Sequence, residues 1–174
     1  MRRNIDDAIR WRIHGTGLLL VGLVAFQGPA FPAGASAGQA AVMADVAPDS
    51  LRLRVEAPDS VPVGRDVATR FIVDNVSGRA LNLYLLGRTI AFDVIVRDPD
   101  GDVVWRRMDG EVVPQILRVE MLPAGGSLVL EATWDQRSND GDPVATGTYS
   151  VEAELFTDGE PLRSPAVNVR IVDR

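Results

Sequence analysis

From residue 51 to the C-terminus, apolar and polar side chains alternate in short segments that end at turn-forming residues. The first segment, LRLRVE at residues 51–56, places Leu51, Leu53 and Val55 on one side of an extended chain, and Pro58 follows it. Alternation of this kind is typical of a half-buried β-strand, whereas an amphipathic helix repeats about every 3.6 residues. No helical period of useful length occurs after residue 50. The chain is therefore predicted to fold from β-strands.

Further segments of the same kind follow at regular spacing, with Gly, Pro and Asp between them. The predicted strands cover residues 51–56, 71–75, 81–85, 91–97, 103–105, 115–122, 128–134, 149–155 and 167–171. Short strands with turn residues between them are typical of an antiparallel β-sandwich of immunoglobulin-like build. We predict an all-β fold with one such sandwich of about eight or nine strands over residues 51–174.

The supply of reactive side chains is small. Cysteine is absent, His14 is the only histidine, and the 18 basic residues are all arginine. Serine hydrolases of the usual kind need an imidazole base, cysteine hydrolases a thiolate, and Schiff-base enzymes a lysine amine. Zinc sites depend mainly on histidine and cysteine. We therefore predict no catalytic activity, no metal site and no cofactor.

Carboxylate chemistry is the enzymatic alternative that the composition leaves open. Glu120 and Glu131, or Glu152 and Glu154, supply the two acidic groups that glycoside hydrolysis requires. Glu152 and Glu154 lie two residues apart and are expected on one face of a strand. Alternating glutamates on an exposed strand face are ordinary solvated residues, and a small sandwich offers no deep cleft. The non-catalytic interpretation is therefore favoured.

The acidic segment DPDGD at residues 98–102 has two interpretations. Alternating carboxylates begin a calcium loop, but an EF-hand loop has its glycine at about the sixth position, and Gly101 is in the fourth. The same residues form a hairpin turn without a metal ion. The turn is the favoured interpretation.

Three aromatic residues end or begin predicted strands. Trp105 and Trp134 end alternating apolar segments, which predicts packing in or at the edge of the core rather than contact with a partner. Tyr149 begins its strand after a glycine, so its hydroxyl is expected to bond to a nearby loop.

The N-terminus has the order of a secretory signal peptide. Four arginines precede residue 13, residues 17–26 are uninterrupted apolar residues, and small residues end in Ala35-Ser36-Ala37. As a helix the apolar run spans about 15 Å, against about 30 Å for the hydrocarbon core, so a transmembrane anchor is the weaker alternative. We predict a signal peptide over residues 1–37, a linker over 38–50, and the sandwich domain over 51–174. The domain is then exported to the periplasm, cell envelope or medium, with no membrane association after cleavage.

The charge balance limits the class of partner. The formal net charge is −6, and removal of the predicted signal peptide makes it more negative, because that segment holds more arginine than aspartate. An acidic domain is poorly suited to nucleic acid or to an anionic membrane surface. We expect neither as a partner.

Two loops are candidates for contact with a protein partner. Residues 106–114 place basic and then apolar side chains between two strands, whereas residues 135–143 are longer and polar. Apolar Met108 and Val112 have little reason to face water, which favours the first loop. The alternative is that both loops are solvated connections whose arginines pair with nearby carboxylates. The candidate contact residues are Arg106, Arg107, Met108, Val112 and Arg137.

A series of motifs in this domain resembles the bacterial intracellular proteinase inhibitor (BsuPI) family. The motifs are FDV at residues 92–94, RDPDG at 97–101, VVWR at 103–106, DG at 109–110, LPAG at 122–125, LEATW at 130–134 and GTYSVEA at 147–153. The resemblance extends over roughly residues 51–172. It implies a domain that binds and inhibits a serine proteinase. No motif identifies a reactive-site residue, and the predicted export signal differs from the intracellular location in the family's name.

Together these observations predict an exported, non-catalytic domain that binds a protein. The resemblance implies a proteinase inhibitor of the BsuPI type, in which a loop occludes the active site of a serine proteinase. The alternative is a cell-envelope, immunoglobulin-like interaction or structural module without inhibitory activity. A more distant alternative is an enzyme that uses two carboxylates.

Overall fold

The computed structural model describes residues 48–173. The predicted signal peptide and most of the predicted linker lie outside these residues. One 3-10 turn, η1 (Pro48–Ser50), precedes the strands, and the described part of the chain contains no α-helix. None of its helical segments is long and apolar enough to cross a membrane.

The described residues form eleven strands. They are β1 (Leu51–Glu56), β2 (Ser60–Pro62), β3 (Val67–Asn75), β4 (Leu81–Leu86), β5 (Phe92–Arg97), β6 (Val103–Arg106), β7 (Leu117–Leu122), β8 (Ser127–Trp134), β9 (Gly147–Leu155), β10 (Leu162–Arg163) and β11 (Val167–Val172). The predicted all-β, immunoglobulin-like sandwich is confirmed, and the predicted number of strands is too low. The two unexpected strands, β2 and β10, have three and two residues, which is too short for an alternating pattern to be visible.

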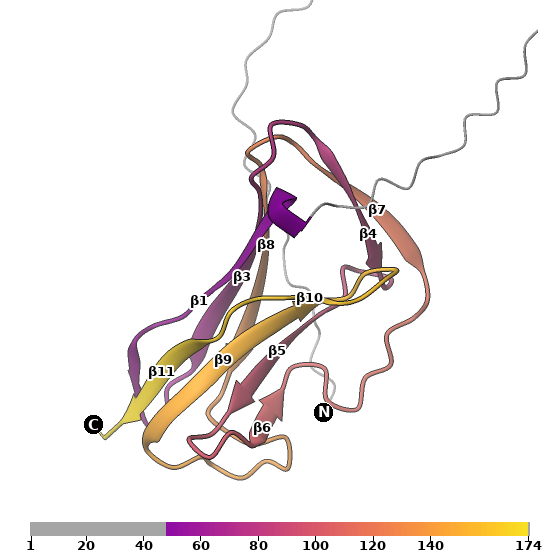
Figure 1. The fold of residues 1–174 in the computed structure, drawn as a ribbon. Helices are drawn as coiled ribbons and strands as arrows, with labels where there is room; N and C mark the ends of the chain where they lie inside the picture. The colour runs from indigo at the N-terminus through magenta and orange to yellow at the C-terminus, as the bar shows by residue number, and fades with distance from the viewer. Residues whose placement is uncertain (1–47, 174) are drawn as a thin grey trace, which may run out of the picture. The chain divides into compact units, whose positions relative to one another are not determined.

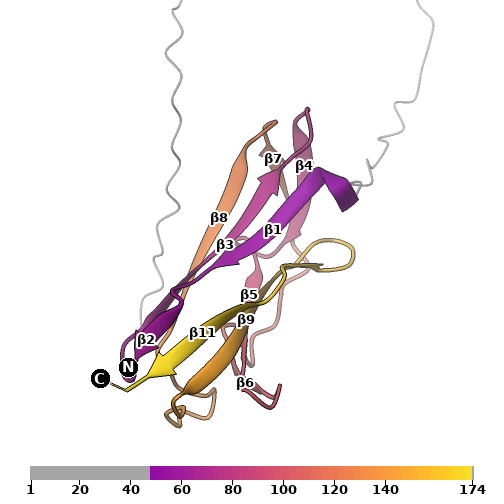
Figure 2. The same ribbon diagram turned by 60° about the vertical axis from the view of Figure 1, so that its left-hand side comes forward.

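The strands form two larger sheets and one two-stranded sheet. The first sheet has the order β1-β3-β8, and the second has the order β2-β11-β9-β5-β6, with β10 paired to β9. Figures 1 and 2 show these two sheets as separate layers. All strand pairs are antiparallel except β2 and β11. The third sheet pairs β4 with β7, and it joins the core through its inward residues.

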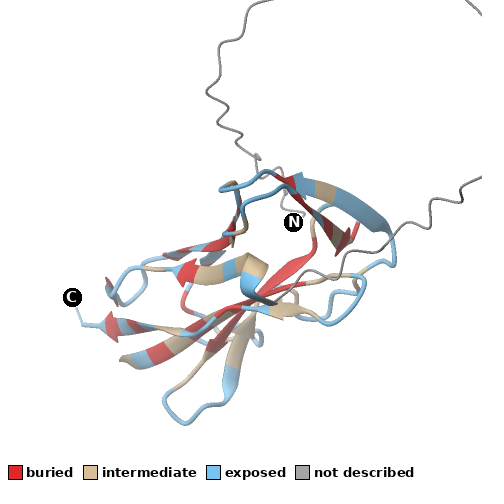
Figure 3. Ribbon diagram, turned by 45° about the horizontal axis from the view of Figure 1, so that its top comes forward, coloured by how far each residue is buried: buried red, intermediate tan, exposed pale blue. Residues whose placement is uncertain are grey.

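The core lies between the two larger sheets. Phe71 of β3, Trp134 of β8 and Val151 of β9 belong to this core, and all three side chains are almost fully buried. The Trp134 and Tyr149 rings lie 5.4 Å apart between centroids at 59°, a tilted contact favourable to aromatic pairs. Figure 3 shows the buried residues concentrated on the facing strands and the exposed ones on the loops. The predicted core position of Trp134 is therefore confirmed, and Trp105 packs half-buried against the same core.

Tyr149 also links the core to a loop. Its hydroxyl donates a hydrogen bond to the carbonyl oxygen of Ala145 at 2.8 Å, which confirms the prediction for this residue. Burial raises the pKa of the Tyr149 phenol above its ordinary value, and the negative charge of Asp98 acts in the same direction.

The acidic segment after β5 forms the predicted hairpin turn. Asp98 Oδ1 accepts the main-chain N–H groups of Asp100 at 3.0 Å and Asp102 at 2.9 Å. Gly101 has a φ of 91°, in the left-handed region that a glycine adopts without steric cost. The turn joins β5 to β6 and so leads the chain into the candidate loop.

Candidate functional site

The first candidate loop connects β6 to β7 and starts with two consecutive turns. The N–H of Asp109 donates to the Arg106 carbonyl at 3.3 Å, and the N–H of Glu111 donates to the Met108 carbonyl at 3.0 Å. Gly110, with a φ of 69°, lies inside the second turn. After these turns, residues 112–116 belong to no strand before β7 begins. The loop thus has a tightly folded base and an exposed outer segment.

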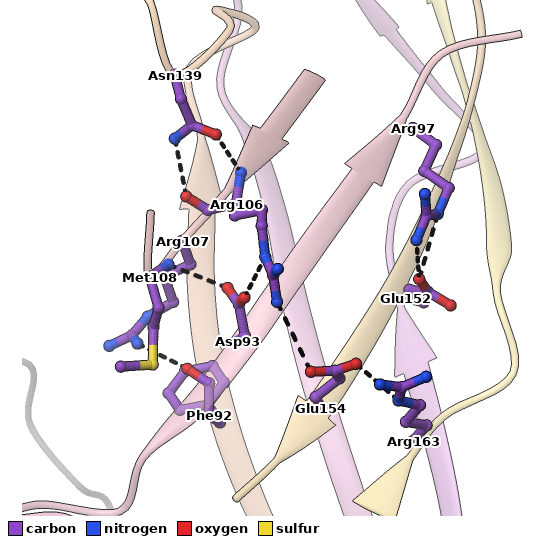
Figure 4. A network of polar contacts seen from close by, with 10 residues as sticks. All are labelled: Phe92, Asp93, Arg97, Arg106, Arg107, Met108, Asn139, Glu152, Glu154 and Arg163. Carbon is purple, nitrogen blue, oxygen red and sulfur yellow. Dashed lines mark hydrogen bonds and ion pairs between the residues drawn. The ribbon is translucent and has the colours of Figure 1, made fainter. Parts of the chain in front are cut away.

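Asp93 of β5 fixes that base. Its carboxylate is 1% exposed, and Oδ2 accepts a hydrogen bond from Arg106 Nε at 2.8 Å. Its other oxygen, Oδ1, accepts the main-chain N–H of Met108 at 3.0 Å. Figure 4 shows the Asp93 carboxylate between these two groups. One buried carboxylate therefore holds both the last residue of β6 and the start of the loop.

A second carboxylate lies directly opposite Asp93. The β5–β9 register pairs Asp93 with Glu154, so the two acidic side chains share the outer face of the sheet. Arg106 Nη2 is 3.7 Å from Glu154 Oε2, and Arg163 Nε is 2.7 Å from Glu154 Oε1. Figure 4 shows this chain of alternating charges running from β6 through β5 and β9 to β10. Two arginines therefore compensate two adjacent, nearly buried carboxylates.

Arg107 has a different environment. Its guanidinium lies 4.1 Å from the centroid of the Phe92 ring, within the range of a cation–π contact. Arg107 Nη1 also donates to the Phe92 carbonyl at 2.9 Å, and its main-chain N–H donates to the Val94 carbonyl at 3.0 Å. Arg107 is therefore folded back on β5.

The second candidate loop packs against the edge of β6. The Asn139 side chain accepts the Arg106 N–H at 2.6 Å and donates to the Arg106 carbonyl at 2.9 Å. The Asn139 N–H donates to the Val104 carbonyl at 3.0 Å. The two loops that the sequence singled out are thus brought together at β6, as Figure 4 shows for Asn139 and Arg106.

Gln136 fixes the other end of this loop. It has a φ of 60°, a left-handed conformation uncommon for a residue other than glycine, and its side chain is buried. Its amide accepts the Gly64 N–H at 2.9 Å and donates to the Pro62 carbonyl at 3.0 Å and the Arg65 carbonyl at 2.6 Å. The second loop is therefore attached to the β2–β3 turn as well as to β6.

The five predicted contact residues fall into three groups. Arg106 is bound by Asp93 and Glu154, which agrees with the alternative that loop arginines pair with nearby carboxylates. The side chains of Arg107, Met108 and Arg137 lie against the protein or within a loop: Met108 is half-buried, and Arg137 Nη1 donates to the Gly141 carbonyl at 2.7 Å. Val112 is 85% exposed. As partner contacts, all five stay predictions.

Sequence reasoning missed the residues that hold the two loops in place. Asp93 interrupts the apolar segment FDVIV and was given no role of its own, and Glu154 interrupts VEAEL and was expected to be a solvated strand residue. A charged side chain within an otherwise apolar strand was the available signal. Asn139 and Gln136 have no comparable signal, because their partners are main-chain groups distant in sequence.

A shallow hollow lies beside the base of the first loop. It is lined by Asp93, Arg106, Met108, Asp109, Gly110, Glu111, Val113 and Phe156. Among the described residues, no three acidic side chains are grouped so that they could hold a metal ion.

Solved structures that are similar to this chain have low sequence identity to it. The CARDB domain of a Pyrococcus furiosus protein is 17% identical, with a TM-score of 0.39 over 71% of this chain and 94% of that chain. An alkylpurine DNA glycosylase from Pseudomonas fluorescens is 13% identical, with a TM-score of 0.39 over 70% of this chain and 30% of that chain. A β-glucosidase from Erythrobacter marinus is 15% identical, with a TM-score of 0.41 over 71% and 15% of the two chains.

Among curated proteins no match is found. The family model described as "Intracellular proteinase inhibitor", BsuPI, matches residues 53–160, which is more than half of the chain. The matched residues extend from β1 to the turn after β9 and include both candidate loops. The chain therefore belongs to the BsuPI intracellular proteinase inhibitor family.

Proposed function

We propose that this chain is an exported, non-catalytic domain that inhibits a serine proteinase by occluding its active site with residues 111–114. The observation that carries the proposal is the family match over residues 53–160, which includes this segment. The geometry of the loop is consistent with this proposed mechanism.

The segment has the features of a substrate-like inhibitory loop. An inhibitor of this type presents an extended main chain with one side chain that enters the specificity pocket of the proteinase. Val112 is 85% exposed, and Pro114 restricts the preceding residue to an extended conformation. The N–H of Ile116 donates to the Pro114 carbonyl at 2.8 Å, which turns the chain back toward β7. Val112 therefore fits a proteinase whose pocket accepts a small aliphatic side chain.

The fixed base of the loop supports binding by lowering its entropic cost. A flexible loop loses conformational freedom when it binds, at about 0.5–1.5 kcal/mol for each immobilised side chain. Here Asp93 already holds Arg106 and the Met108 N–H, and Asn139 holds both main-chain groups of Arg106. Most of the ordering at the base is thus complete before a partner binds.

Export follows from the predicted signal peptide over residues 1–37. When the full-length gene is expressed in a bacterial host, the chain recovered from the periplasm or medium should begin at Gly38. N-terminal sequencing of that material tests the prediction. An intact N-terminus on cytoplasmic protein would contradict export and leave the inhibitory proposal to be tested separately.

The function is tested by titrating the protein against serine proteinases of aliphatic, aromatic and basic specificity, with residual activity measured on a small chromogenic substrate. We expect activity to fall to a plateau at a fixed molar ratio for an enzyme of aliphatic specificity, with the added chain left uncleaved. The Val112→Asp variant should bind about 100-fold more weakly, because a carboxylate in an apolar pocket costs at least ~3 kcal/mol. Val76→Asp is the matched control, since Val76 is also exposed but follows β3, outside both loops.

Two results would overturn the proposal. Equal inhibition by the Val112→Asp and wild-type proteins would remove residues 111–114 from the binding site. Absence of inhibition across the panel, or simple digestion of the added chain, would favour the alternative of an envelope interaction or structural module.

A further inference from the structure

Strand β7 presents apolar side chains to solvent. Leu117, Val119 and Met121 are 53%, 55% and 65% exposed, and they share one face of the strand. Across the β4–β7 register they lie opposite Leu86, Tyr84 and Asn82. Figure 3 shows this strand coloured as exposed over most of its length. The usual arrangement, with apolar residues inward and polar residues outward, is therefore reversed on most of β7.

The opposite face of β7 carries a charged pair. Arg118 and Glu120 alternate with the apolar residues, and Arg118 Nη2 lies 3.4 Å from Glu120 Oε1. Both side chains are partly exposed, so the pair lies at the margin of the core. The strand thus has one apolar face and one face with adjacent opposite charges.

Strand β4 uses its main-chain groups on both edges. The N–H of Leu86 donates to the Phe156 carbonyl at 3.0 Å, and the Tyr84 carbonyl accepts the Asp158 N–H at 3.1 Å. Even-numbered residues of β4 therefore direct their main-chain groups away from β7. Because these groups alternate between the two edges of a strand, the odd-numbered residues of β4 bond to β7.

The same alternation assigns the main-chain groups of β7. The N–H of Gly87 donates to the Ile116 carbonyl at 2.9 Å, so even-numbered residues of this strand face β4. Leu117, Val119 and Met121 therefore direct their N–H and C=O groups to the other edge. Within the described part of the chain, no strand pairs with that edge. An edge of this kind is a template for another strand.

The sequence of β7 is complementary to itself in the antiparallel direction. If a two-fold axis passes beside Val119, Val119 lies opposite Val119 of a second copy, and Arg118 lies opposite Glu120 of that copy. Leu117 then lies opposite Met121, so the apolar residues stay together on one face. We propose that the open edge of β7 is an interface for a second copy of this chain, paired antiparallel about Val119.

The hydrogen-bond pattern supports the same register. Val119 has its main-chain groups at the open edge, so the two Val119 residues form a hydrogen-bonded pair. Arg118 and Glu120 of the other copy then form a non-hydrogen-bonded pair, in which Cα atoms are about 4.5 Å apart and side chains are closest. A register centred on Leu117 would instead place Arg118 opposite Ile116, and one centred on Met121 would place Glu120 opposite Leu122. Of these three registers, only the one centred on Val119 pairs the charges.

The dimer would have a consequence for binding. It joins β4 and β7 of both copies into one four-stranded sheet with a continuous apolar face. Residues 111–116 precede β7, so in an antiparallel pair the two candidate inhibitory segments leave from opposite ends of the paired strands. The interface goes beyond the proposed inhibitory function and does not depend on it.

Sedimentation velocity of the full-length protein over a concentration series tests the interface by exchanging charges. The wild-type chain should reach twice the monomer mass. The Arg118→Glu and Glu120→Arg variants should each be monomeric at the same concentration, because each places like charges opposite one another. An equimolar mixture of the two variants should recover the dimer, since every pair across the axis is then of opposite charge. Arg65→Glu, an exposed substitution in the β2–β3 turn, is the control and should stay dimeric.

A further variant, Val119→Pro, distinguishes loss of the interface from loss of the fold. Val119→Pro removes one N–H from the open edge but leaves the groups that bond to β4, so it should be folded by circular dichroism and monomeric. All variants carry the same N-terminal segment, so association through that segment would not respond to these changes. A monomeric wild-type protein at every concentration would overturn the proposal. A dimer that survives Val119→Pro, or a mixture that stays monomeric, would also overturn it.

Discussion

Asp93 holds the base of the first candidate loop through Arg106 and the Met108 N–H, so removing its charge should loosen that loop. The Asp93→Asn variant keeps an oxygen that can accept the Met108 N–H, but it loses the charged bond to Arg106. Asp93→Ala loses both. We expect both variants to fold, with lower stability and a more mobile residue 106–111 segment in the Asp93→Ala protein.

The expected loss of stability in the two variants depends on how far Asp93 and its partners are buried. A hydrogen bond to a charged group contributes about 1.5–3 kcal/mol, and breaking a buried ion pair costs about 3–5 kcal/mol. Asp93 is 1% exposed, but the Arg106 side chain is 41% exposed and keeps Glu154 nearby, which reduces the cost. We therefore expect the free energy of unfolding to fall by about 2 kcal/mol for Asp93→Asn and about 4 kcal/mol for Asp93→Ala.

Urea denaturation measures the stability, and amide hydrogen exchange at Met108 measures the loop. The exchange rate at Met108 should rise more in Asp93→Ala than in Asp93→Asn, because only the former removes the acceptor. Asp59→Asn is the matched control. Asp59 is exposed, and it accepts the Arg170 N–H through its main-chain carbonyl, which the substitution leaves in place. If Asp93→Ala changed the stability by less than about 0.5 kcal/mol and left Met108 exchange unaltered, Asp93 would not be the anchor of this loop.

Three further predictions concern the core and the second loop. Trp134→Ala should lower the free energy of unfolding by about 3–5 kcal/mol in urea, because the ring is fully buried; a loss below 1 kcal/mol would refute its core role. Gln136→Ala should lower the free energy of unfolding in urea by about 3 kcal/mol, because three hydrogen bonds are lost. Gln136→Gly should lower it less, because glycine tolerates the φ of 60°, and a larger loss for the glycine variant would contradict this. Tyr149 has a raised pKa in the folded state, so stability should be unaffected by this group below about pH 10 and should fall above it. Tyr149→Phe should flatten that fall in denaturation curves at alkaline pH, and an unchanged slope would argue against the shift.

The strand order along the chain was predictable because alternation is a local property. Each predicted strand from residue 51 onward has a counterpart, within a few residues at its ends. The β6–β7 loop was also placed correctly, because turn residues and an apolar segment bound it. Strands β2 and β10 were not predictable, since they exist only by pairing with β11 and β9.

The candidate site was less predictable because its important contacts are long-range. Arg106 looks like a free loop cation in sequence, and only the β5–β6 and β5–β9 pairings bring Asp93 and Glu154 to it. The alternation of Leu117, Val119 and Met121 with charged residues is visible in the sequence. Whether these residues can pair with another strand depends on which edge of β7 is open, and the sequence does not show that. Register is set by the whole sheet, and a single segment does not reveal it.

Occlusion of a proteinase active site by residues 111–114 can be tested by competition for that active site. The protein is mixed with a serine proteinase that it inhibits, and the complex is measured before and after a small covalent inhibitor fills the specificity pocket of the enzyme. We expect no complex with the blocked enzyme. In the complex with the free enzyme, the chain should resist cleavage near Val112 by a second, added proteinase. Equal binding to free and blocked enzyme would contradict occlusion by this loop, as would a panel of proteinases in which none forms a complex.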